Sequence, residues 1–399
     1  LDVFSGKWRR RDVTELLYDL PLVTKGDLQA DAERYTLSSL AKNRRVYLTT
    51  GGSTALPMGF YDAKRISAAV ETAYIHFLWS QTGYTPTSRS AVFRGSVVST
   101  HSDKNKQNSA GPKKRLWMSD PFRRSMIFSS YHLQGDDLDQ IYQRLLSFDP
   151  PYIQAYPSAA NMLAAYIEES GQPAQMNLKA LLLGPETLPL WQRQRIERAF
   201  GAPVYSWYGH AEKAALAGER FGQSQLHVIP GYGYIYLCAD DGSIITAPDT
   251  PGEIITTGFL NQGTQFVNYR TGDIGLWSAE AYGKLGNMLT RVLQRVEGRA
   301  QELALTGDGR RISMCAINMH SGIFDAVRQF RFVQRRAGEI EMHIVAKNSF
   351  TENDERKILQ GVSEKFGADM KLTIEHVTEL PTTSRGKARF LVQHLDLEL

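Results

Sequence analysis

The chain has 399 residues, of which 42% are hydrophobic and 22% charged, and its formal net charge is +4. This length exceeds one ordinary hydrophobic core, so we expect two domains. A mild positive charge spread over so long a chain does not indicate a nucleic-acid-binding protein. Its apolar runs fall short of the roughly 20 residues that a membrane-spanning helix requires, so we expect no membrane span.

The two cysteines, Cys238 and Cys315, both stand among apolar residues. Buried free thiols are typical of proteins that work in a reducing compartment. We therefore expect a cytoplasmic location. The Cys and His residues do not have the spacing of a zinc site.

In chain order, the first clear elements alternate between helix and strand. Residues 135–148 place apolar side chains on one helical face, and Pro150 stops that helix. Ser158 is expected to cap a second helix that ends at Gly171. A strand at residues 179–183, a helix at 187–200 and a strand at 203–206 follow. This alternation predicts an α/β fold.

After Pro230 the pattern changes to short strands separated by turns, which predicts a β-rich subdomain. Its strands are expected at residues 232–238, 244–246, 253–257 and 275–278. A smaller α+β domain follows, with helices at 314–328 and 352–366 and strands at 329–334, 339–346 and 371–377. We place the boundary near Gly298, between a large domain of residues 1–298 and a small domain of residues 299–399.

In residues 46–59 a short apolar run is followed by a cluster of hydroxyl residues and glycines, and then by a Pro-x-Gly turn. The cluster comprises Thr49, Thr50, Gly51, Gly52, Ser53 and Thr54. Hydroxyl donors and exposed backbone N–H groups at this density suit a loop that wraps a polyphosphate, because glycine allows close backbone approach. The segment lacks the Gly-Lys-Ser/Thr of a P-loop, and a plain surface turn has a similar composition.

Gly184-Pro185-Glu186 comes directly after a predicted buried strand. The carboxyl ends of strands in α/β sheets are where ligands bind. An ordinary strand-to-helix turn explains the same residues equally well.

Another strand leads into the segment Tyr205-Ser-Trp-Tyr-Gly-His-Ala-Glu212. Tyr208 beside Gly209 can present a flat ring to a purine. Glu212, four residues after Tyr208, can hold a hard cation, since Mg²⁺ prefers carboxylate and phosphate oxygens. Aromatic residues at a strand end are also common in an ordinary core.

The segment Asn268-Tyr-Arg-Thr-Gly-Asp273 holds a carboxylate after a tight Thr-Gly turn. Such a carboxylate can accept hydrogen bonds from both hydroxyls of a ribose, although Gly-Asp turns also occur without a ligand.

The segment Leu380-Pro-Thr-Thr-Ser-Arg-Gly-Lys-Ala-Arg-Phe390 places Lys387 after a flexible turn. Its ammonium can bring a point charge to a developing oxyanion. A basic segment near the end of a chain is otherwise usually solvated surface.

In this order, the five segments resemble those of the adenylate-forming superfamily of acyl-CoA ligases and related enzymes. The phenylacetate–CoA ligase-like branch, which includes proteins encoded with capsule-biosynthesis genes, is the most similar part of it. Leu20-Pro-Leu-Val-Thr-Lys-Gly-Asp27 and Ile153-Gln-Ala-Tyr-Pro-Ser158 also resemble segments of that branch. The resemblance covers most of the chain.

The resemblance implies a role for each segment. The loop from Thr49 to Thr54 would grip the ATP phosphates, and residues 184–186 would contribute to the nucleotide site. Tyr208 would stack on adenine with Gly209 beside it, and Glu212 would ligate Mg²⁺. Asp273 would bind the ribose hydroxyls with Arg299 close by. Lys387 would reach the α-phosphate and the substrate carboxylate, and the small domain would act as a lid that rotates about residues 297–301.

Three positions depart from the pattern of the superfamily. Met58 stands where many members carry a lysine, and Gln301 stands where the hinge is usually acidic. His210 replaces a common apolar residue and could favour an anionic or polar substrate as part of the catalytic site. Local packing or hydrogen bonding of His210 is the alternative.

We therefore expect an enzyme that uses ATP and Mg²⁺ to convert a carboxylic acid to an acyl-adenylate and then transfers the acyl group to CoA. A second interpretation keeps the adenylation but passes the acyl group to an amine or hydroxyl in polysaccharide or cofactor biosynthesis. A third is a nucleotide-binding scaffold without turnover. Six aromatic residues could line the acyl pocket or simply fill the core: Trp79, Tyr84, Phe93, Tyr131, Tyr156 and Trp207.

Overall fold

The computed structural model describes residues 13–49, 58–93, 115–133, 135–171, 175–285, 287–299, 303–313, 323–367, 369–381 and 390–395. The chain forms two compact units that are discontinuous in sequence. Unit 1 combines Leu1–Tyr74, Gly209–Ala217 and His227–Gln294, and unit 2 combines Ile75–Tyr208, Gly218–Leu226 and Arg295–Leu399. The domain boundary expected near Gly298 remains a prediction.

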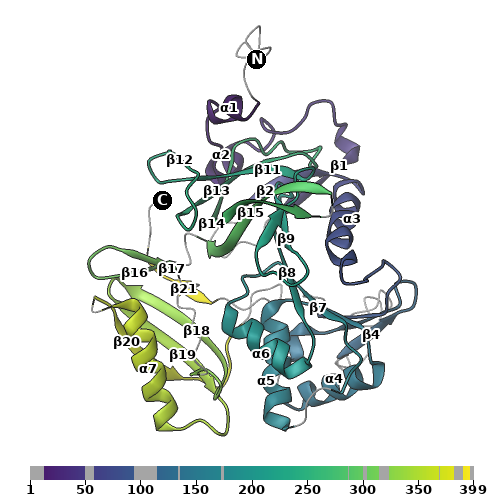
Figure 1. The fold of residues 1–399 in the computed structure, drawn as a ribbon. Helices are drawn as coiled ribbons and strands as arrows, with labels where there is room; N and C mark the ends of the chain where they lie inside the picture. Colours follow the sequence, from purple (N-terminus) through teal and green to yellow (C-terminus); the bar gives the residue numbers. More distant parts are fainter. Residues whose placement is uncertain are drawn as a thin grey trace, which may run out of the picture. The chain divides into compact units, whose positions relative to one another are not determined.

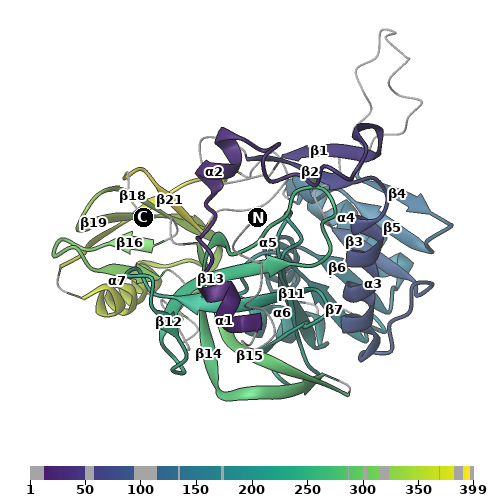
Figure 2. The same ribbon diagram turned by 90° about the horizontal axis from the view of Figure 1, so that it is seen from above.

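Unit 1 contains an antiparallel sheet and a separate hairpin. The sheet strands lie in the order β12-β11-β13-β14-β15, and β1 pairs with β2 (Figure 1). Helix α1 lies against β11, where the rings of Tyr18 and Tyr236 meet edge-on with centroids 5.0 Å apart (Figure 2). The bounds are α1 Val13–Tyr18, α2 Lys25–Ala30, β1 Arg45–Thr49, β2 Gly59–Ala63, β11 Gly233–Cys238, β12 Ile244–Ile245, β13 Pro251–Gly258, β14 Tyr269–Leu285 and β15 Met288–Arg299.

The β-rich subdomain expected after Pro230 is confirmed, but two strands differ from the prediction. The strand expected at residues 275–278 is the middle of β14, which runs from Tyr269 to Leu285, and β15 was not predicted. The outer part of β14 is mostly exposed, so its sequence lacks the apolar alternation that identifies a half-buried strand.

Unit 2 contains a parallel sheet with one antiparallel edge strand. The strands lie in the order β8-β7-β6-β3-β5-β4, and only β4 runs antiparallel to its neighbour. The bounds are β3 Ser90–Phe93, β4 Trp117–Asp120, β5 Ser125–Phe128, α4 Gly135–Phe148, β6 Tyr152–Ala155, α5 Pro157–Ser170, β7 Ala180–Leu183, α6 Leu190–Phe200 and β8 Val204–Gly209. Helix α3 Ser67–Ser80 and strands β9 Leu216–Glu219 and β10 Leu226–Val228 contain residues of both units.

The predicted alternation in unit 2 is confirmed, with one correction at the start of α5. Tyr156, not Ser158, precedes the first turn, and Pro157 occupies its first position. Proline suits that position because its ring presets φ and its missing N–H needs no partner. Ser158 instead donates its backbone N–H to Glu186 Oε2 at 3.1 Å.

In its described residues (303–313, 323–367, 369–381 and 390–395), the small C-terminal domain has a four-stranded sheet and one helix. Its strands lie in the order β20-β19-β18-β21, and a two-stranded β16-β17 pair precedes them. The bounds are β16 Leu303–Leu305, β17 Arg311–Ser313, β18 Val327–Arg336, β19 Glu339–Ala346, α7 Glu352–Phe366, β20 Lys371–His376 and β21 Leu391–Gln393. The chain thus has a large mixed α/β part and a small C-terminal domain, as the sequence predicts.

The helix expected at residues 314–328 is wrong at its end. Val327 and Arg328 open strand β18, and a turn precedes them. The run Phe330-Arg331-Phe332 alternates between apolar and charged residues, and Phe330 and Phe332 reach the core, which is the pattern of a strand. Residues 314–322 lie outside the described part of the chain.

Cys238 is a buried free cysteine in β11, as expected. Burial raises the pKa of its thiol, so the less reactive protonated form is favoured. Cys315 lies outside the described residues. None of the helices in the described ranges has both the length and the apolar character needed to cross a bilayer.

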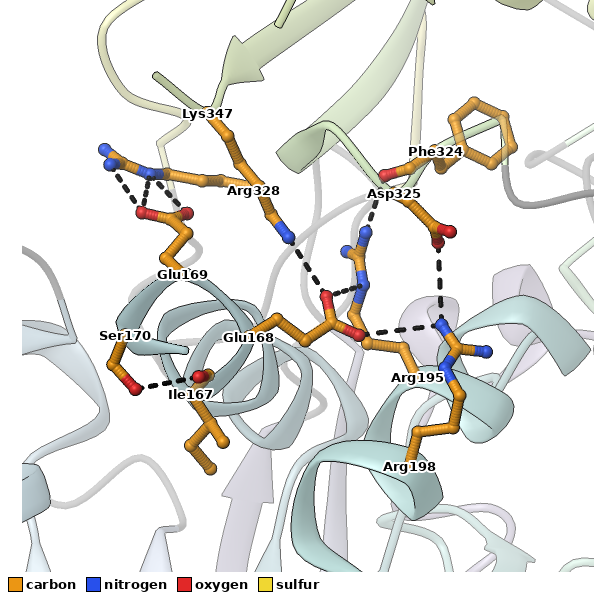
Figure 3. Close-up of polar contacts among 10 residues, drawn as sticks. All are labelled: Ile167, Glu168, Glu169, Ser170, Arg195, Arg198, Phe324, Asp325, Arg328 and Lys347. Atoms are coloured by element: carbon orange, nitrogen blue, oxygen red, sulfur yellow. Dashed lines mark hydrogen bonds and ion pairs between the residues drawn. The ribbon is translucent and has the colours of Figure 1, made fainter. Parts of the chain in front are cut away.

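Within unit 2, the ends of α5 and α6 contact the small domain through a cluster of charges that we call the Glu168 clasp (Figure 3). Glu168 accepts from Lys347 Nζ at 3.0 Å, and its carboxylate lies 3.3 Å from Arg195 Nε and 3.5 Å from Arg198. Arg195 also donates to the carbonyl of Phe324 at 2.5 Å. Both Arg195 and Lys347 are buried, with side-chain exposures of 2% and 6%.

Aromatic packing accompanies this clasp. The ring of Phe324 stacks on Phe330 at 4.4 Å, and Trp191 of α6 stacks on Phe330 at 5.1 Å. A second ion pair joins Glu169 to Arg328 through contacts of 2.7–3.1 Å. The contact is therefore an aromatic core with charged partners around it.

Replacing Glu168 with alanine should loosen this contact. Two buried cations would lose their shared carboxylate, and breaking a buried pair costs about 3 kcal/mol or more. Hydrogen exchange of the α6 and β18 amides should report an opening free energy lower by about that amount. Glu169→Ala is the matched control, because Arg328 is 44% exposed and exposed pairs contribute at most about 1 kcal/mol. Equal effects of the two changes would contradict the interpretation.

Candidate active site

Tyr269 is the residue at which the predicted segments of unit 1 meet. Its hydroxyl donates to Glu212 Oε1 at 3.1 Å and lies 3.8 Å from the sulfur of Met58. Tyr269 and Met58 share a core with Leu28, Phe60, Ala214 and Phe266. The end of the hydroxyl-glycine segment, the segment with Glu212 and the segment with Asp273 therefore lie together.

The N-terminal Pro-x-x-x-Lys-x-Asp segment pairs with the start of β14 through Val23, which bridges to Tyr269. Val23 donates its N–H to the carbonyl of Asn268 at 2.9 Å, and Arg270 donates to the carbonyl of Val23 at 2.9 Å. Thr24 and Asp27 form a capping box that starts α2 directly afterwards. These backbone bonds attach the N-terminal segment to the residues on either side of Tyr269.

The hydroxyl-glycine loop connects two paired strands. Thr49 ends β1 and lies opposite Gly59 at the start of β2, so both ends of the connection are held close together. Residues Thr50, Gly51, Gly52, Ser53 and Thr54 lie outside the described part of the chain. Met58 has no exposed surface, and a lysine in its apolar surroundings would need a partner for its charge.

Glu212 and His210 face each other in the turn after β8. His210 Nδ1 lies 3.3 Å from Glu212 Oε2, and the two side chains are 8% and 9% exposed. An ionised carboxylate has about four acceptor positions, so Glu212 can keep the Tyr269 hydrogen bond while a hard cation coordinates its other oxygen. The donor set therefore fits Mg²⁺.

Asp273 follows Tyr269 on β14, after a fixed turn. Gly272 has a φ of +74°, which suits glycine, and its N–H bonds Glu253 Oε1 at 3.0 Å. The N–H of Asp273 bonds Thr271 Oγ1 at 3.0 Å. Tyr269 and Asp273 are four residues apart on β14, and the pairing of β14 with β13 shifts register between them. Glu212 and Asp273 thus belong to the same unit, since Asp273 lies on β14 and Glu212 bonds Tyr269 of the same strand.

Unit 2 brings the other predicted residues to the carboxyl edge of its parallel sheet. Glu186 accepts from the N–H of Ser158 at 3.1 Å, so its carboxylate occupies the N-terminus of α5, where a negative charge is favoured. The backbone of Gly184 lies against the indole of Trp207 in the neighbouring strand β8. Pro185 follows directly, and Tyr208 is next to Trp207 on the chain.

The side chains of three residues named in the sequence analysis are not described. Arg299 ends β15, but its side chain lies outside what is described, and Lys387 and Gln301 lie outside the described residues altogether. Gly209, which follows Tyr208 on the chain, is the first residue of the Gly209–Ala217 segment of unit 1. The roles assigned to these residues remain predictions.

Four of the aromatic candidates, Trp79, Tyr84, Phe93 and Trp207, are buried in unit 2. Trp79 and Tyr84 meet edge-on at 5.2 Å, and Phe93 stacks on Phe128 at 4.6 Å. Tyr156 packs on the same core as Phe93, and the side chain of Tyr131 is not described. Their role in an acyl pocket remains a prediction.

Three further residues of the site lack a sequence signal of their own: Tyr269, Lys213 and Asp62. Tyr269 stands inside the Asn-Tyr-Arg-Thr-Gly-Asp segment and Lys213 directly follows Glu212, so both were close to the signal. Asp62 follows the hydroxyl-glycine segment, but its partner, Lys213, is 151 residues away.

Gly184→Ala should destabilise unit 2 more than Gly201→Ala. A Cβ at Gly184 would meet Trp207 Nε1 at 2.7 Å, whereas a Cβ at Gly201 meets nothing within 4 Å. Both glycines have positive φ, so both changes carry a backbone cost of about 1–3 kcal/mol. Overpacking should add about 1–3 kcal/mol at Gly184 alone. Thermal unfolding midpoints measure the difference, and equal midpoints would refute the steric argument.

Comparison with known proteins identifies similar sequences. Residues 305–394 match the model of the CapK C-terminal domain family. The chain is 25% identical to Protein CapK of Staphylococcus aureus over 386 residues, which covers 94% of this chain and 80% of the relative.

Solved structures share the fold at low sequence identity. A 2-hydroxyisobutyryl-CoA ligase in the postadenylation state matches with a TM-score of 0.68 and 19% identity, covering 94% of this chain and 80% of that one. A benzoate CoA ligase from Burkholderia xenovorans LB400 matches with a TM-score of 0.55 and 15% identity, covering 88% and 69%. The resemblance found in the sequence is thereby confirmed at the level of the fold: this chain has the fold of these adenylate-forming CoA ligases and is similar in sequence to CapK.

Proposed function

We propose that the protein uses ATP to convert a carboxylic acid to an acyl-adenylate and then transfers the acyl group to CoA. The convergence at Tyr269 carries this proposal, because it joins the end of the hydroxyl-glycine loop to Glu212. The fold supports it, since similar structures include a CoA ligase bound to an acyl-AMP.

In the proposed reaction a carboxylate oxygen of the substrate attacks the α-phosphorus of ATP, and pyrophosphate leaves. The substrate is already a nucleophile, so the protein contributes positioning and charge neutralisation. The loop of residues 49–54 would hold the phosphates, Asp273 the ribose and Tyr208 the adenine. Glu212 would hold Mg²⁺, which neutralises phosphate charge when bound, while Tyr269 and His210 orient that carboxylate.

A second acceptor is also worth testing. The match of residues 305–394 to the CapK C-terminal domain motivates transfer of the acyl group to an amine or hydroxyl instead of CoA, as in polysaccharide or cofactor biosynthesis. The two versions share the adenylation step and differ only in the acceptor.

Pyrophosphate exchange into ATP across a panel of carboxylic acids tests the first step. We expect exchange with at least one acid class. Exchange with none of the acids, together with ATP binding, would favour a nucleotide-binding scaffold and overturn the proposal.

Product mass spectrometry with and without CoA tests the second step. We expect an acyl-CoA and CoA-dependent release of AMP. An acylated amine or hydroxyl formed at the same rate without CoA would support the alternative acceptor.

Lys387→Ala should lower the rate of pyrophosphate exchange at least about tenfold, because it removes a positive charge aimed at the developing oxyanion. ATP binding should stay nearly unchanged. Lys371→Ala is the matched control, since this exposed lysine starts β20 of the same domain. Unchanged exchange by the Lys387 variant would show that the catalytic cation lies elsewhere.

A further inference from the structure

Lys213 forms a buried ion pair directly beside Glu212. Its ammonium donates to Asp62 Oδ2 at 2.8 Å, and the two side chains are 9% and 4% exposed. Asp62 lies on β2, the strand that leaves the hydroxyl-glycine loop. The pair therefore ties the turn that carries Glu212 to the strand that leaves the loop.

The backbone of this turn is held in an unfavourable conformation. Lys213 has a φ of +56°, a left-handed geometry that costs a residue with a side chain about 1–2 kcal/mol. Its N–H bonds the carbonyl of His210 at 3.0 Å and closes the turn. Strain of this kind persists only where the surroundings hold the residue in place.

Packing fixes the chain immediately after the turn. Thr256 Oγ1 donates to the carbonyl of Ala214 at 2.6 Å. The backbones of Gly233 and Gly258 approach Ala214 so closely that a Cβ would lie 2.1 Å from its carbonyl oxygen or 2.7 Å from its Cα. Because Ala214 is closely packed, relaxation of the strained turn falls mainly on Lys213, and the Asp62 pair opposes that relaxation.

Lys213 also balances further negative charge. Glu71 lies close enough for Lys213 to lower the pKa of its carboxyl, although burial, the larger effect, raises that pKa overall. Tyr232 donates to Glu71 at 3.1 Å. Lys213 thus pairs with Asp62 and also acts electrostatically on Glu71.

We propose that Lys213 and Asp62 are positioning residues for Glu212. The pair holds the turn of residues 210–213 in its strained form, and so directs the Glu212 carboxylate toward a divalent cation bound with the phosphates. This inference rests on the proposed function, in which Glu212 holds Mg²⁺.

The test is the affinity of the ATP-bound protein for Mn²⁺, a paramagnetic substitute for Mg²⁺, titrated by electron paramagnetic resonance. The double variant D62N/K213M removes both charges together, which buried pairs usually tolerate, and it leaves the net charge unchanged. We expect its thermal midpoint to stay close to that of the wild type and its Mn²⁺ affinity to fall about tenfold or more. Lys213→Arg, which keeps the charge and the pair, should retain the affinity.

A matched control removes another ion pair without touching this turn. Arg310 and Asp369 pair at 3.2 Å on the exposed surface of the small domain. The variant R310M/D369N should bind Mn²⁺ like the wild type. A similar loss of affinity in this control would overturn the inference, because the effect would then not be specific to the turn.

A double-mutant cycle shows whether the pair acts through Glu212. Glu212→Gln should weaken Mn²⁺ binding in the wild type but add little in the D62N/K213M background, because the ligand is already misdirected there. Additive losses, or unchanged affinity in a folded D62N/K213M variant, would overturn the inference. Failure of the proposed function has a different signature: wild-type protein that binds Mn²⁺ and ATP but exchanges no pyrophosphate with any acid.

Discussion

The hydrogen bond from Tyr269 to Glu212 is the interaction on which the arrangement of the site in unit 1 depends. Both residues are buried, with exposures of 2% and 7%. A buried hydroxyl or carboxylate that loses its partner costs about 1–3 kcal/mol. This free-energy cost favours only those arrangements in which the strand with Tyr269 and the turn with Glu212 lie side by side. Met58, on the other side of Tyr269, adds the end of the hydroxyl-glycine loop to the same point.

Unit 2 has a similar hydrogen bond to a carboxylate at the edge of its parallel sheet. The carboxylate of Glu186 lies at the N-terminus of α5 and accepts a backbone N–H there, while glycine at position 184 lets the backbone lie against the indole of Trp207. In both units an acidic group accepts a hydrogen bond from a donor distant in sequence, at a point where the main chain turns. Preorganised groups of this kind suit a reaction in which the protein mainly positions charges.

In the Glu168 clasp, buried cations are paired with a carboxylate. Burial lowers the pKa of Arg195, and Glu168 opposes that effect, so the carboxylate offsets part of the free-energy cost of burying the cation. The aromatic stack of Trp191, Phe324 and Phe330 supplies the apolar part of the contact. Charge pairing and apolar packing together join α5 and α6 to the small domain within unit 2.

Local patterns in the sequence were sufficient for much of the fold. Helical periodicity predicted α4 and α7, a short apolar run predicted β7, and glycine predicted the end of α5. The segments with Glu212 and Asp273 were recognisable from their turn chemistry and order. What only the tertiary structure decided is the choice of partners across long separations: Tyr269 with Glu212, 57 residues apart, and Lys213 with Asp62, 151 residues apart. Periodicity and turn signals act over a few residues, whereas these pairs depend on which strands lie side by side and on which polar groups are buried together.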